Sequence, residues 1–223
     1  GITLYLIDLS HRYDVSSLEL QLIDQKIEEI KKFFADTLGV IELQVSTDQL
    51  YIELSDQLFL LQGLLAENRA FEEVSFTNLR GLETEKISRF QTEQMELFDV
   101  SNLENFQQAV AGRNFFGDVY YTLSGPFVTL ASPVRNRKGI IIQVLSAEVN
   151  LKEITQSIEI SRLGASGYAT LTDKNGSLIA SGQRIGIPQG ADMVKYSRTR
   201  QVLAGRPFNA LEEEDIYESP FGR

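Results

Sequence analysis

The sequence predicts a mixed α+β fold, in which one long N-terminal helix accompanies two modules built on antiparallel sheets. Three patterns in the sequence predict it. Apolar residues follow a helical period over residues 17–66, alternating patterns separated by turn residues begin at residue 76, and a further strand, turn and strand pattern begins at residue 167. The expected parts are a helical segment over residues 1–70, a first module over 71–160 and a second over 161–223.

The expected helix lies between Ser17 and Ala66, a stretch without proline. Its apolar residues recur at spacings of three and four and form one stripe, which consists of Leu20, Ile23, Ile27, Ile30, Phe34, Leu38, Ile41, Val45, Leu54, Leu58, Leu61 and Leu65. At 1.5 Å per residue such a helix spans roughly 75 Å, longer than a globular domain of this size is wide. It therefore supports packed sheets as a spine or pairs with a second copy as a coiled coil. We expect the spine, with a homodimer formed through this helix.

The first module is expected to contain five strands and an inserted helix. The strands lie over residues 76–83, 86–91, 117–123, 126–134 and 140–149. A short helix over residues 102–111 separates the second strand from the third, with Ser101 as its N-cap and Gly112 at its end. A helix over residues 150–160 then leads to the second module.

The second module shows a hairpin, with strands over residues 167–172 and 177–181. Its turn, Asp173 to Gly176, contains an Asn-Gly pair that adopts the positive φ angles of a tight turn. A helix is expected over residues 194–204, and an acidic loop over residues 212–218. Two strands are too few for a stable sheet. We therefore expect this module either to pack against the long N-terminal helix for stability or to lack the strands that would complete its sheet.

Composition excludes several classes of protein. The chain has no cysteine and a single histidine, His11, which excludes disulfide scaffolds, Cys–His nucleophile pairs and zinc fingers. Its formal charge of -10 opposes binding to nucleic acid. The longest apolar run near the N-terminus, Ile2 to Leu9, contains Asp8 and is too short to span a membrane. We expect no signal peptide, metal, cofactor or catalytic group.

Three segments in their order and spacing resemble the double Cache sensor domain of bacterial transmembrane receptors. They are VSFTNLRGLE (residues 74–83), GPFVTLASPVRNRKGIIIQVLSAEVNLKEI (residues 125–154) and LGASGYATLTDKNGSLIAS (residues 163–181). In the last, a Gly-Tyr strand precedes an Asp-x-x-Gly turn and a Leu-Ile-Ala strand, similar to the family's module junction. The resemblance covers nearly the whole chain and implies two PAS-like modules beside one N-terminal helix.

The resemblance implies an extracytoplasmic, non-enzymatic sensor of a small molecule in a membrane-anchored receptor. Such domains are joined to histidine kinases, chemoreceptors or nucleotide cyclases, and we expect a histidine kinase. Members continue with more strands after the region that matches residues 217–223, so the second module is expected to be incomplete. The alternatives are a dimerisation or protein-interaction module without a small ligand, and a hydrolase that uses two carboxylates such as Glu83 and Glu148.

The resemblance also implies a ligand site in the first module, between its sheet and the loop and helix that cover it. The candidate ligand-binding residues are Arg80, Arg89, Tyr120, Tyr121, Thr129, Ser132 and Glu148. Either arginine could clamp a ligand carboxylate with two hydrogen bonds, or could pair with a surface glutamate instead. The two tyrosines are adjacent on a strand, so at most one of them faces a pocket.

Glu148 bears on the class of ligand. In amino-acid-binding relatives, an acidic residue at the end of this strand pairs with the ligand amino group. The same relatives carry an arginine and a tryptophan before the pocket helix, where this chain has FDVSNLENFQQA and no tryptophan. A carboxylate or an amine ligand is therefore expected, and the sequence leaves the choice open.

Overall fold

The computed structural model describes residues 4–8, 17–46, 54–90, 95–163, 167–182, 187–194, 199–200 and 203–204. The chain divides into two compact units. The first unit comprises residues 34–118 and 127–151, and the second comprises residues 2–33, 119–126 and those from 152 onward. Each contains an antiparallel sheet and helices, which confirms the predicted α+β class.

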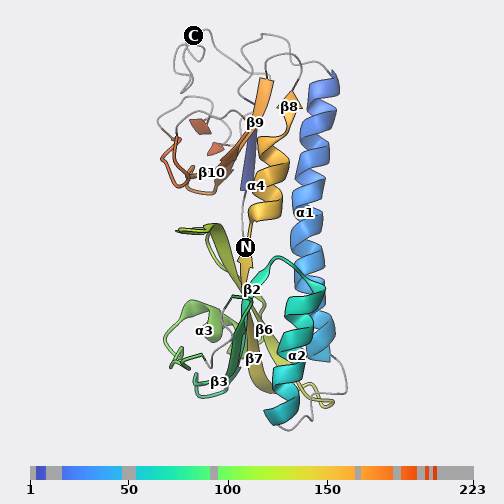
Figure 1. Ribbon diagram of the computed structural model, residues 1–223, viewed down its shortest axis with the longest axis vertical. Coiled ribbons are helices and arrows are strands. Elements are labelled where there is room, and N and C mark those ends of the chain that lie inside the picture. Colours follow the sequence, from blue (N-terminus) through green and yellow to red (C-terminus); the bar gives the residue numbers. More distant parts are fainter. Residues whose placement is uncertain are drawn as a thin grey trace. The chain divides into compact units, whose positions relative to one another are not determined.

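Two helices occupy the stretch in which one was predicted. Helix α1 (Ser17–Ser46) and helix α2 (Leu54–Glu67) appear in blue and cyan in Figure 1. The prediction of one continuous helix is therefore wrong. Residues 46–54 contain neither proline nor glycine, and the apolar spacing resumes after them, so composition gave no sign of the break. Within the first unit, the Asn68 side chain donates a hydrogen bond to Oγ1 of Thr37 in α1.

The larger sheet has six strands, one more than predicted, and all of them except β5 lie mainly in the first unit. Their order is β3-β2-β7-β6-β4, with β5 paired to β6. The strands are β2 (Phe71–Asn78), β3 (Glu83–Ser88), β4 (Phe115–Phe116), β5 (Tyr120–Thr122), β6 (Gly125–Arg135) and β7 (Ile141–Asn150).

The first strand begins at Phe71, five residues before the predicted start. The chain turns at Asn78, whose side-chain oxygen accepts hydrogen bonds from the backbone N–H groups of Arg80 and Leu82. This Asn-centred turn was not expected, because the prediction placed the turn at residues 83–85.

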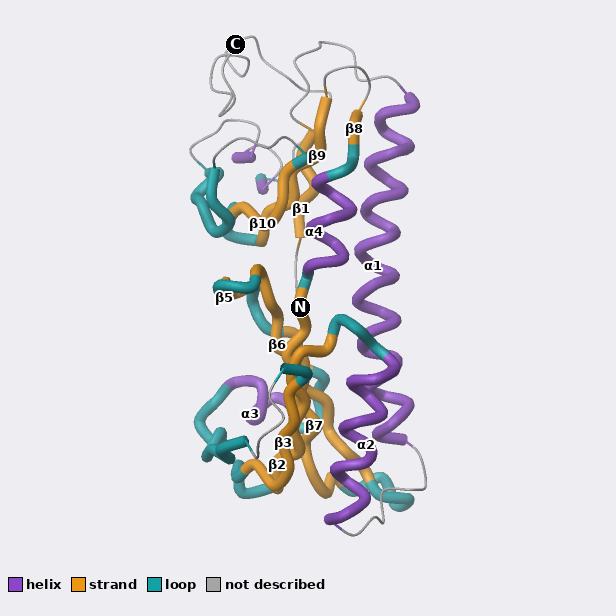
Figure 2. Tube along the Cα trace, viewed as in Figure 1, coloured by secondary structure: helices purple, strands orange, loops and turns teal. Residues whose placement is uncertain are grey.

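The two faces of this sheet have different covers (Figure 2). On one face, Ala131 and Val144 pack with Phe106 and Ala109 of helix α3 (Glu104–Val110). We call this the α3 face. Alternate residues point the other way, and that face is apolar and lies against α2.

Helix α3 differs slightly from its prediction. Its N-cap position is Leu103, which makes no side-chain capping bond, so the predicted role of Ser101 as the cap is wrong. The predicted end at Gly112 is confirmed, because that residue has a φ of 88° and its N–H binds the carbonyl of Ala109.

The second unit has four strands, not the two that the sequence suggested. They are β1 (Leu4–Asp8), β8 (Arg162–Leu163), β9 (Gly167–Asp173) and β10 (Leu178–Ser181). Strand β9 pairs antiparallel with the other three. Strand β1 was missed because its partner lies at the far end of the sequence, where no local pattern connects the two.

Helix α4 (Lys152–Glu159) packs against β9 and β10. The predicted hairpin turn is confirmed, since Asp173 accepts hydrogen bonds from the N–H groups of Asn175 and Ser177. Of the Asn-Gly pair, however, only Gly176 has the predicted positive φ, at 82°. The predicted helix over residues 194–204 is only partly described, and the acidic loop over 212–218 lies outside the described residues. Among the helices of the described part, none is both long enough and apolar enough to cross a bilayer.

Candidate functional site

The α3 face of the first-unit sheet carries a group of polar side chains. Residues opposite one another on neighbouring strands share a face, and every second residue along a strand returns to it. Counted from Ala131 and Val144, this face includes Glu73, Ser75 and Thr77 from β2, Lys86 and Ser88 from β3, Thr129 from β6, and Ser146 and Glu148 from β7. We call this group the polar patch.

Thr129 and Glu148, both predicted as ligand-binding residues, lie at the centre of the patch. They lie directly opposite each other on β6 and β7. The Thr129 hydroxyl is 3.0 Å from one carboxylate oxygen of Glu148 and 2.9 Å from the other. Because a hydroxyl carries one proton and a carboxylate accepts about four hydrogen bonds, this contact orients the carboxylate.

Lys86 forms a buried ion cluster beside them. Its ammonium lies 3.0 Å from a carboxylate oxygen of Glu73 and 3.2 Å from one of Glu83, and its side chain is only 11% exposed. The ring of Phe98 lies over it, 5.3 Å away. Burial alone would lower the pKa of Lys86, but the hydrogen bond and charge of Glu73, with those of Glu83, raise that pKa above its ordinary value. The ammonium is therefore charged and already compensated.

The charges of the patch and its ion cluster are unequal. Glu73, Glu83 and Glu148 contribute three negative charges and Lys86 one positive charge, which leaves a formal charge of -2. Such a surface attracts cations. In the part of the chain that the structure describes, no group of three or more metal-ligating side chains is placed to hold a metal ion.

The segment before α3 is attached to the turn between β2 and β3. The Glu83 carboxylate accepts a hydrogen bond from the N–H of Phe98 at 2.9 Å, and the N–H of Val100 binds the carbonyl of Gly81 at 2.7 Å. A Cβ atom on Gly81 would lie 2.5 Å from the Cα atom of Ser101. This close approach requires glycine. It places the segment that leads into α3 against the edge of the polar patch.

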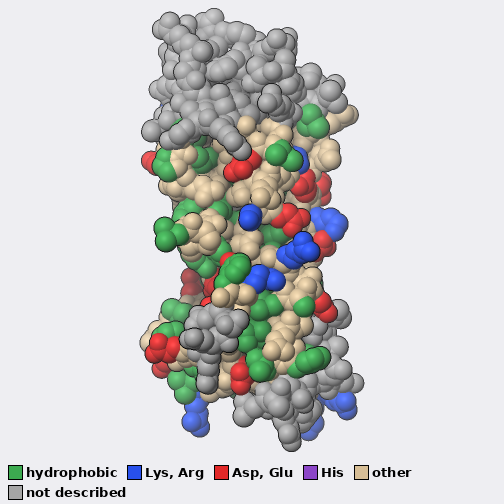
Figure 3. All heavy atoms as spheres, in the orientation of Figure 1, with side chains coloured by type: hydrophobic (Ala, Val, Ile, Leu, Met, Phe, Trp, Pro, Cys, Tyr) green, Lys and Arg blue, Asp and Glu red, His purple; other side chains and the backbone are tan. Residues whose placement is uncertain are grey.

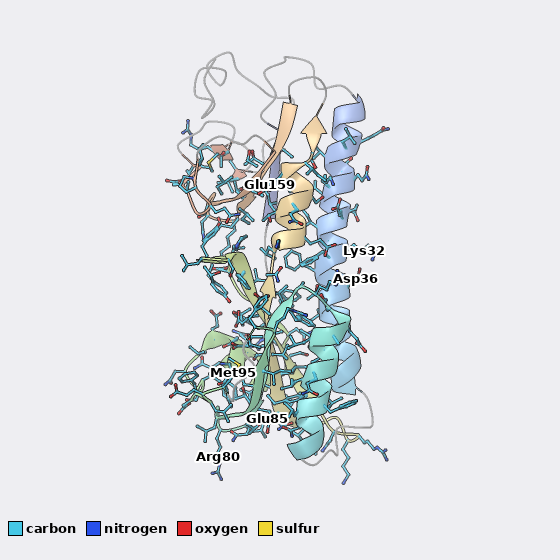
Figure 4. The ribbon with its side chains drawn as sticks, viewed as in Figure 1. Lys32, Asp36, Arg80, Glu85, Met95 and Glu159 are labelled. Atoms are coloured by element: carbon cyan, nitrogen blue, oxygen red, sulfur yellow. The ribbon has the colours of Figure 1, made fainter. Side chains whose placement is uncertain are left out.

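The two predicted arginines are not brought together with Glu148. The Arg89 guanidinium donates hydrogen bonds to the carbonyls of Leu65, Asn68 and Phe71, at the end of α2 and the start of β2. Arg80 is exposed in the turn after β2 and points away from the strands (Figure 4). A ligand-binding role for Arg80 or Arg89 remains a prediction.

The remaining predicted residues lie elsewhere. The Tyr121 hydroxyl donates a hydrogen bond to the carbonyl of Leu178, 3.0 Å away within the second unit. Burial, with the nearby charge of Asp173, raises the pKa of Tyr121 to about 12. Tyr120 is exposed. Ser132 is on the face opposite to Thr129 and donates a hydrogen bond to the Asn114 side chain at 2.9 Å.

Sequence reasoning missed Lys86, Glu73 and the small hydroxyl residues of the patch. A signal was present in FEEVSFTN, where Glu73, Ser75 and Thr77 alternate with Val74 and Phe76. The predicted strand began at residue 76, so this alternation fell outside it. The proposed acid and base pair of Glu83 with Glu148 gains no support, because Glu83 is held by Lys86 and by the backbone of Phe98.

No family model matches the chain, and no curated protein is similar to it in sequence. Several solved structures are similar in fold. The ligand-binding domain of the Campylobacter jejuni chemoreceptor Tlp3, in complex with L-valine, is 14% identical with a TM-score of 0.59, over 80% of this chain and 75% of that chain. The ligand-binding domain of the Pseudomonas aeruginosa chemoreceptor PctC, in complex with GABA, is 17% identical with a TM-score of 0.52, over 75% and 72%.

A third similar structure is the extracellular domain of a protein assigned as a histidine kinase, vpHK1S-Z8. It is 16% identical, with a TM-score of 0.61 over 74% of this chain and 69% of that chain. At these identities the likeness concerns the fold. Apart from strand β1, the strands of both antiparallel sheets follow the N-terminal helices α1 and α2. The chain therefore has the fold of the bacterial double Cache sensor domains.

Proposed function

We propose that this chain is the extracytoplasmic small-molecule sensing domain of a bacterial membrane receptor, with a histidine kinase as its output. The observation that carries the proposal is the polar patch in the first unit, where Thr129 orients Glu148 beside a compensated Lys86. The fold supports it, since the similar structures are sensory and ligand-binding domains. A sensor needs only a ligand that binds one of two conformations more tightly than the other.

The ligand that suits this patch carries a positively charged amine. The formal charge of -2 favours a cation, and Glu148 is an oriented acceptor for an ammonium group. A ligand carboxylate would need a cationic partner. Lys86 is the cation that the described part of this face offers, and two glutamates already compensate it. Simple amines should therefore bind better than organic acids.

A thermal-shift screen followed by calorimetry tests this proposal. The probes are a monoamine, a diamine, GABA, L-valine and succinate. A ligand present at 100 times its dissociation constant adds about 2.7 kcal/mol to the free energy of unfolding, which is several degrees for a domain of this size. We expect the amines to raise the melting temperature and succinate to leave it unchanged.

The matched variants are Glu148→Gln and Glu104→Gln. Glu104 is an exposed residue in the first turn of α3, and it is not a member of the polar patch. We expect Glu148→Gln to weaken amine binding at least tenfold and Glu104→Gln to leave it unchanged. Stabilisation by succinate alone, or amine binding that survives Glu148→Gln, would contradict the proposed ligand class.

A further inference from the structure

The outward face of α2 is apolar and uncharged. Phe59 is 74% exposed and Leu58 is 38% exposed, while Leu61 and Leu64 on the inward face are fully buried. No charged residue lies between Asp56 and Glu67. Figure 3 shows hydrophobic side chains gathered over this part of the surface. A helix that presents an apolar face to solvent is a candidate for contact with another protein.

The exposed residues form one stripe with an uneven distribution of size. Phe59, Gln62, Gly63 and Ala66 follow spacings of three and four, so they line one side of the helix. We call them the Phe59 stripe. Its large side chain is at one end, and its small residues are in the middle and at the other end. A Cβ atom on Gly63 would find nothing within 4 Å, so the helix backbone is open to close approach there.

We propose that the Phe59 stripe is a homodimer interface, in which the α2 helices of two copies pack antiparallel about a two-fold axis. In such an isologous contact, if residue i of one copy meets residue j of the other, then residue j of the first copy also meets residue i of the second. With the axis between positions 62 and 63, Phe59 lies opposite Ala66 of the partner subunit, and Gln62 lies opposite Gly63 of the partner subunit. The bulky end of each stripe is thereby matched to the small end of the other, and the glycines allow the helix axes to approach closely.

Charge is the reason to name a second copy as the occupant. Each chain has a formal charge of -10, so two copies repel unless the contact itself is free of charge. The exposed side of α1, through which dimerisation was expected, carries many charged residues: Asp24, Glu28, Glu29, Lys31, Lys32 and Asp36. The Phe59 stripe carries none. The six α1 residues comprise four carboxylates and two lysines, a formal charge of -2, so self-association through α2 brings fewer like charges together than association through α1 would.

The expected dimer is weak, because α2 has 14 residues and is about 21 Å long. Its mass should rise with concentration from that of one 25.1 kDa chain toward twice that value. Sedimentation equilibrium between about 5 and 500 µM measures this. We expect Phe59→Glu to abolish the rise, and Leu123→Glu, at a fully exposed leucine outside α2, to leave it unchanged. A wild-type chain that stays monomeric throughout overturns the proposal.

Cross-linking gives an independent test, because the chain has no cysteine. The variants are Gln62→Cys, beside the expected two-fold axis, and Gln25→Cys, on the exposed side of α1. Under mild oxidation we expect a covalent dimer from Gln62→Cys at a rate at least tenfold above that from Gln25→Cys. Faster cross-linking of Gln25→Cys would assign the interface to α1 and overturn the proposal. Neither test depends on the proposed ligand or sensing role.

Discussion

At the scale of single residues, the polar patch combines an oriented acceptor with a compensated cation. Thr129 fixes the Glu148 carboxylate across two strands, while Glu73 and Glu83 hold the Lys86 ammonium. Both arrangements come from the same property of a strand, which returns every second side chain to one face. The loss of each arrangement would have a different effect. Removal of Thr129 would leave the Glu148 carboxylate without its orienting hydrogen bond, whereas removal of Lys86 would leave the carboxylates of Glu73 and Glu83 close together without a cation.

Substitution of Lys86 by methionine tests the importance of this ion cluster. Breaking a buried ion pair leaves an uncompensated charge, and since Glu73 is 29% exposed we expect a loss of about 2–3 kcal/mol in the free energy of unfolding. Urea denaturation at pH 7 measures it. The loss should shrink when Glu73 is also replaced by glutamine, because one of the uncompensated charges is then removed. An equal loss with and without Glu73→Gln would show that packing rather than charge is responsible.

Tyr121 provides a prediction for alkaline pH. Because its pKa is raised to about 12, the folded state holds the phenolic proton more tightly than the unfolded state does. The stability that this residue contributes is therefore complete below the ordinary tyrosine pKa, near 10, and falls as the pH rises toward 12. We expect Tyr121→Phe to cost about 1 kcal/mol at pH 8 through loss of the bond to Leu178. Urea denaturation should show a smaller difference between wild type and variant at pH 11.

The candidate site could be predicted in part at this scale. Glu148 and Thr129 were found through the resemblance, which implied a ligand site in the first module, and both lie within long strands that the sequence predicted. Arg89 was misjudged for a physical reason, since its partners are backbone carbonyls at the end of a helix and no side-chain pattern marks them. Lys86 was overlooked because Glu73, one of its two carboxylate partners, belongs to a strand whose start was placed too late.

At the scale of elements, the carboxyl end of α2 is held next to the start of strand β2. Arg89 donates to three carbonyls there, two of them from the helix and its following residue. The last carbonyls of a helix lack partners within it and carry a partial negative charge. A guanidinium at that position supplies both hydrogen bonds and positive charge.

We expect Arg89→Gln to lower the free energy of unfolding by about 2–3 kcal/mol, because three carbonyls lose a charged donor. Arg80→Gln is the control. That residue is exposed in a turn, so its substitution should change stability by less than about 0.5 kcal/mol. Urea denaturation followed by circular dichroism compares the two. Similar stabilities would show that the α2 end does not depend on this arginine.

Substitutions at two glycines with positive φ distinguish the cost of backbone strain from the cost of a steric clash. Gly81 (φ 86°) meets Ser101, whereas Gly139 (φ 76°) has nothing within 4 Å of an added Cβ. We expect Gly139→Ala to cost about 1 kcal/mol, from strain alone, and Gly81→Ala to cost at least about 1 kcal/mol more, because the segment before α3 must move. Thermal denaturation measures both. Equal losses of stability in the two variants would mean that the segment before α3 moves aside at no cost in free energy.

The existence of elements was more predictable than their ends. Strands β5, β6 and β7, helix α4 and the second-unit hairpin appear where alternation and turn residues placed them. The break between α1 and α2 was not predictable, because the apolar residues keep the same spacing before and after it. The position of β2 was missed because an asparagine closes its turn through side-chain bonds.

At the scale of the whole molecule, the chain contributes to its second unit from both ends of the sequence. Strand β1 pairs along the whole of its length with β9, from Leu4 opposite Asp173 to Asp8 opposite Ala169. Tertiary pairing of this kind cannot be inferred from local periodicity. It also means that the second unit depends on residues that precede the first.

Deletion of residues 1–8 tests this dependence. Without β1 the sheet of the second unit loses the partner on one side of β9, so we expect hydrogen exchange of the β9 and β10 amides to accelerate at least tenfold. Exchange in β2 and β7 of the first unit should change little. Uniform acceleration throughout the chain would show instead that the two units unfold together.

The discontinuity of the second unit has a consequence for biosynthesis. All residues of the first unit lie between positions 34 and 151 in the described chain, so they emerge from the ribosome before β9 and β10 do. The nascent N-terminal strand must then wait, with its edge unsatisfied, through the translation of more than a hundred codons. Synthesis at about 5–20 residues per second makes that interval several seconds or longer. A translational pause or a holding chaperone that acts during this interval should influence the yield of the native protein more than the stability of the finished fold does.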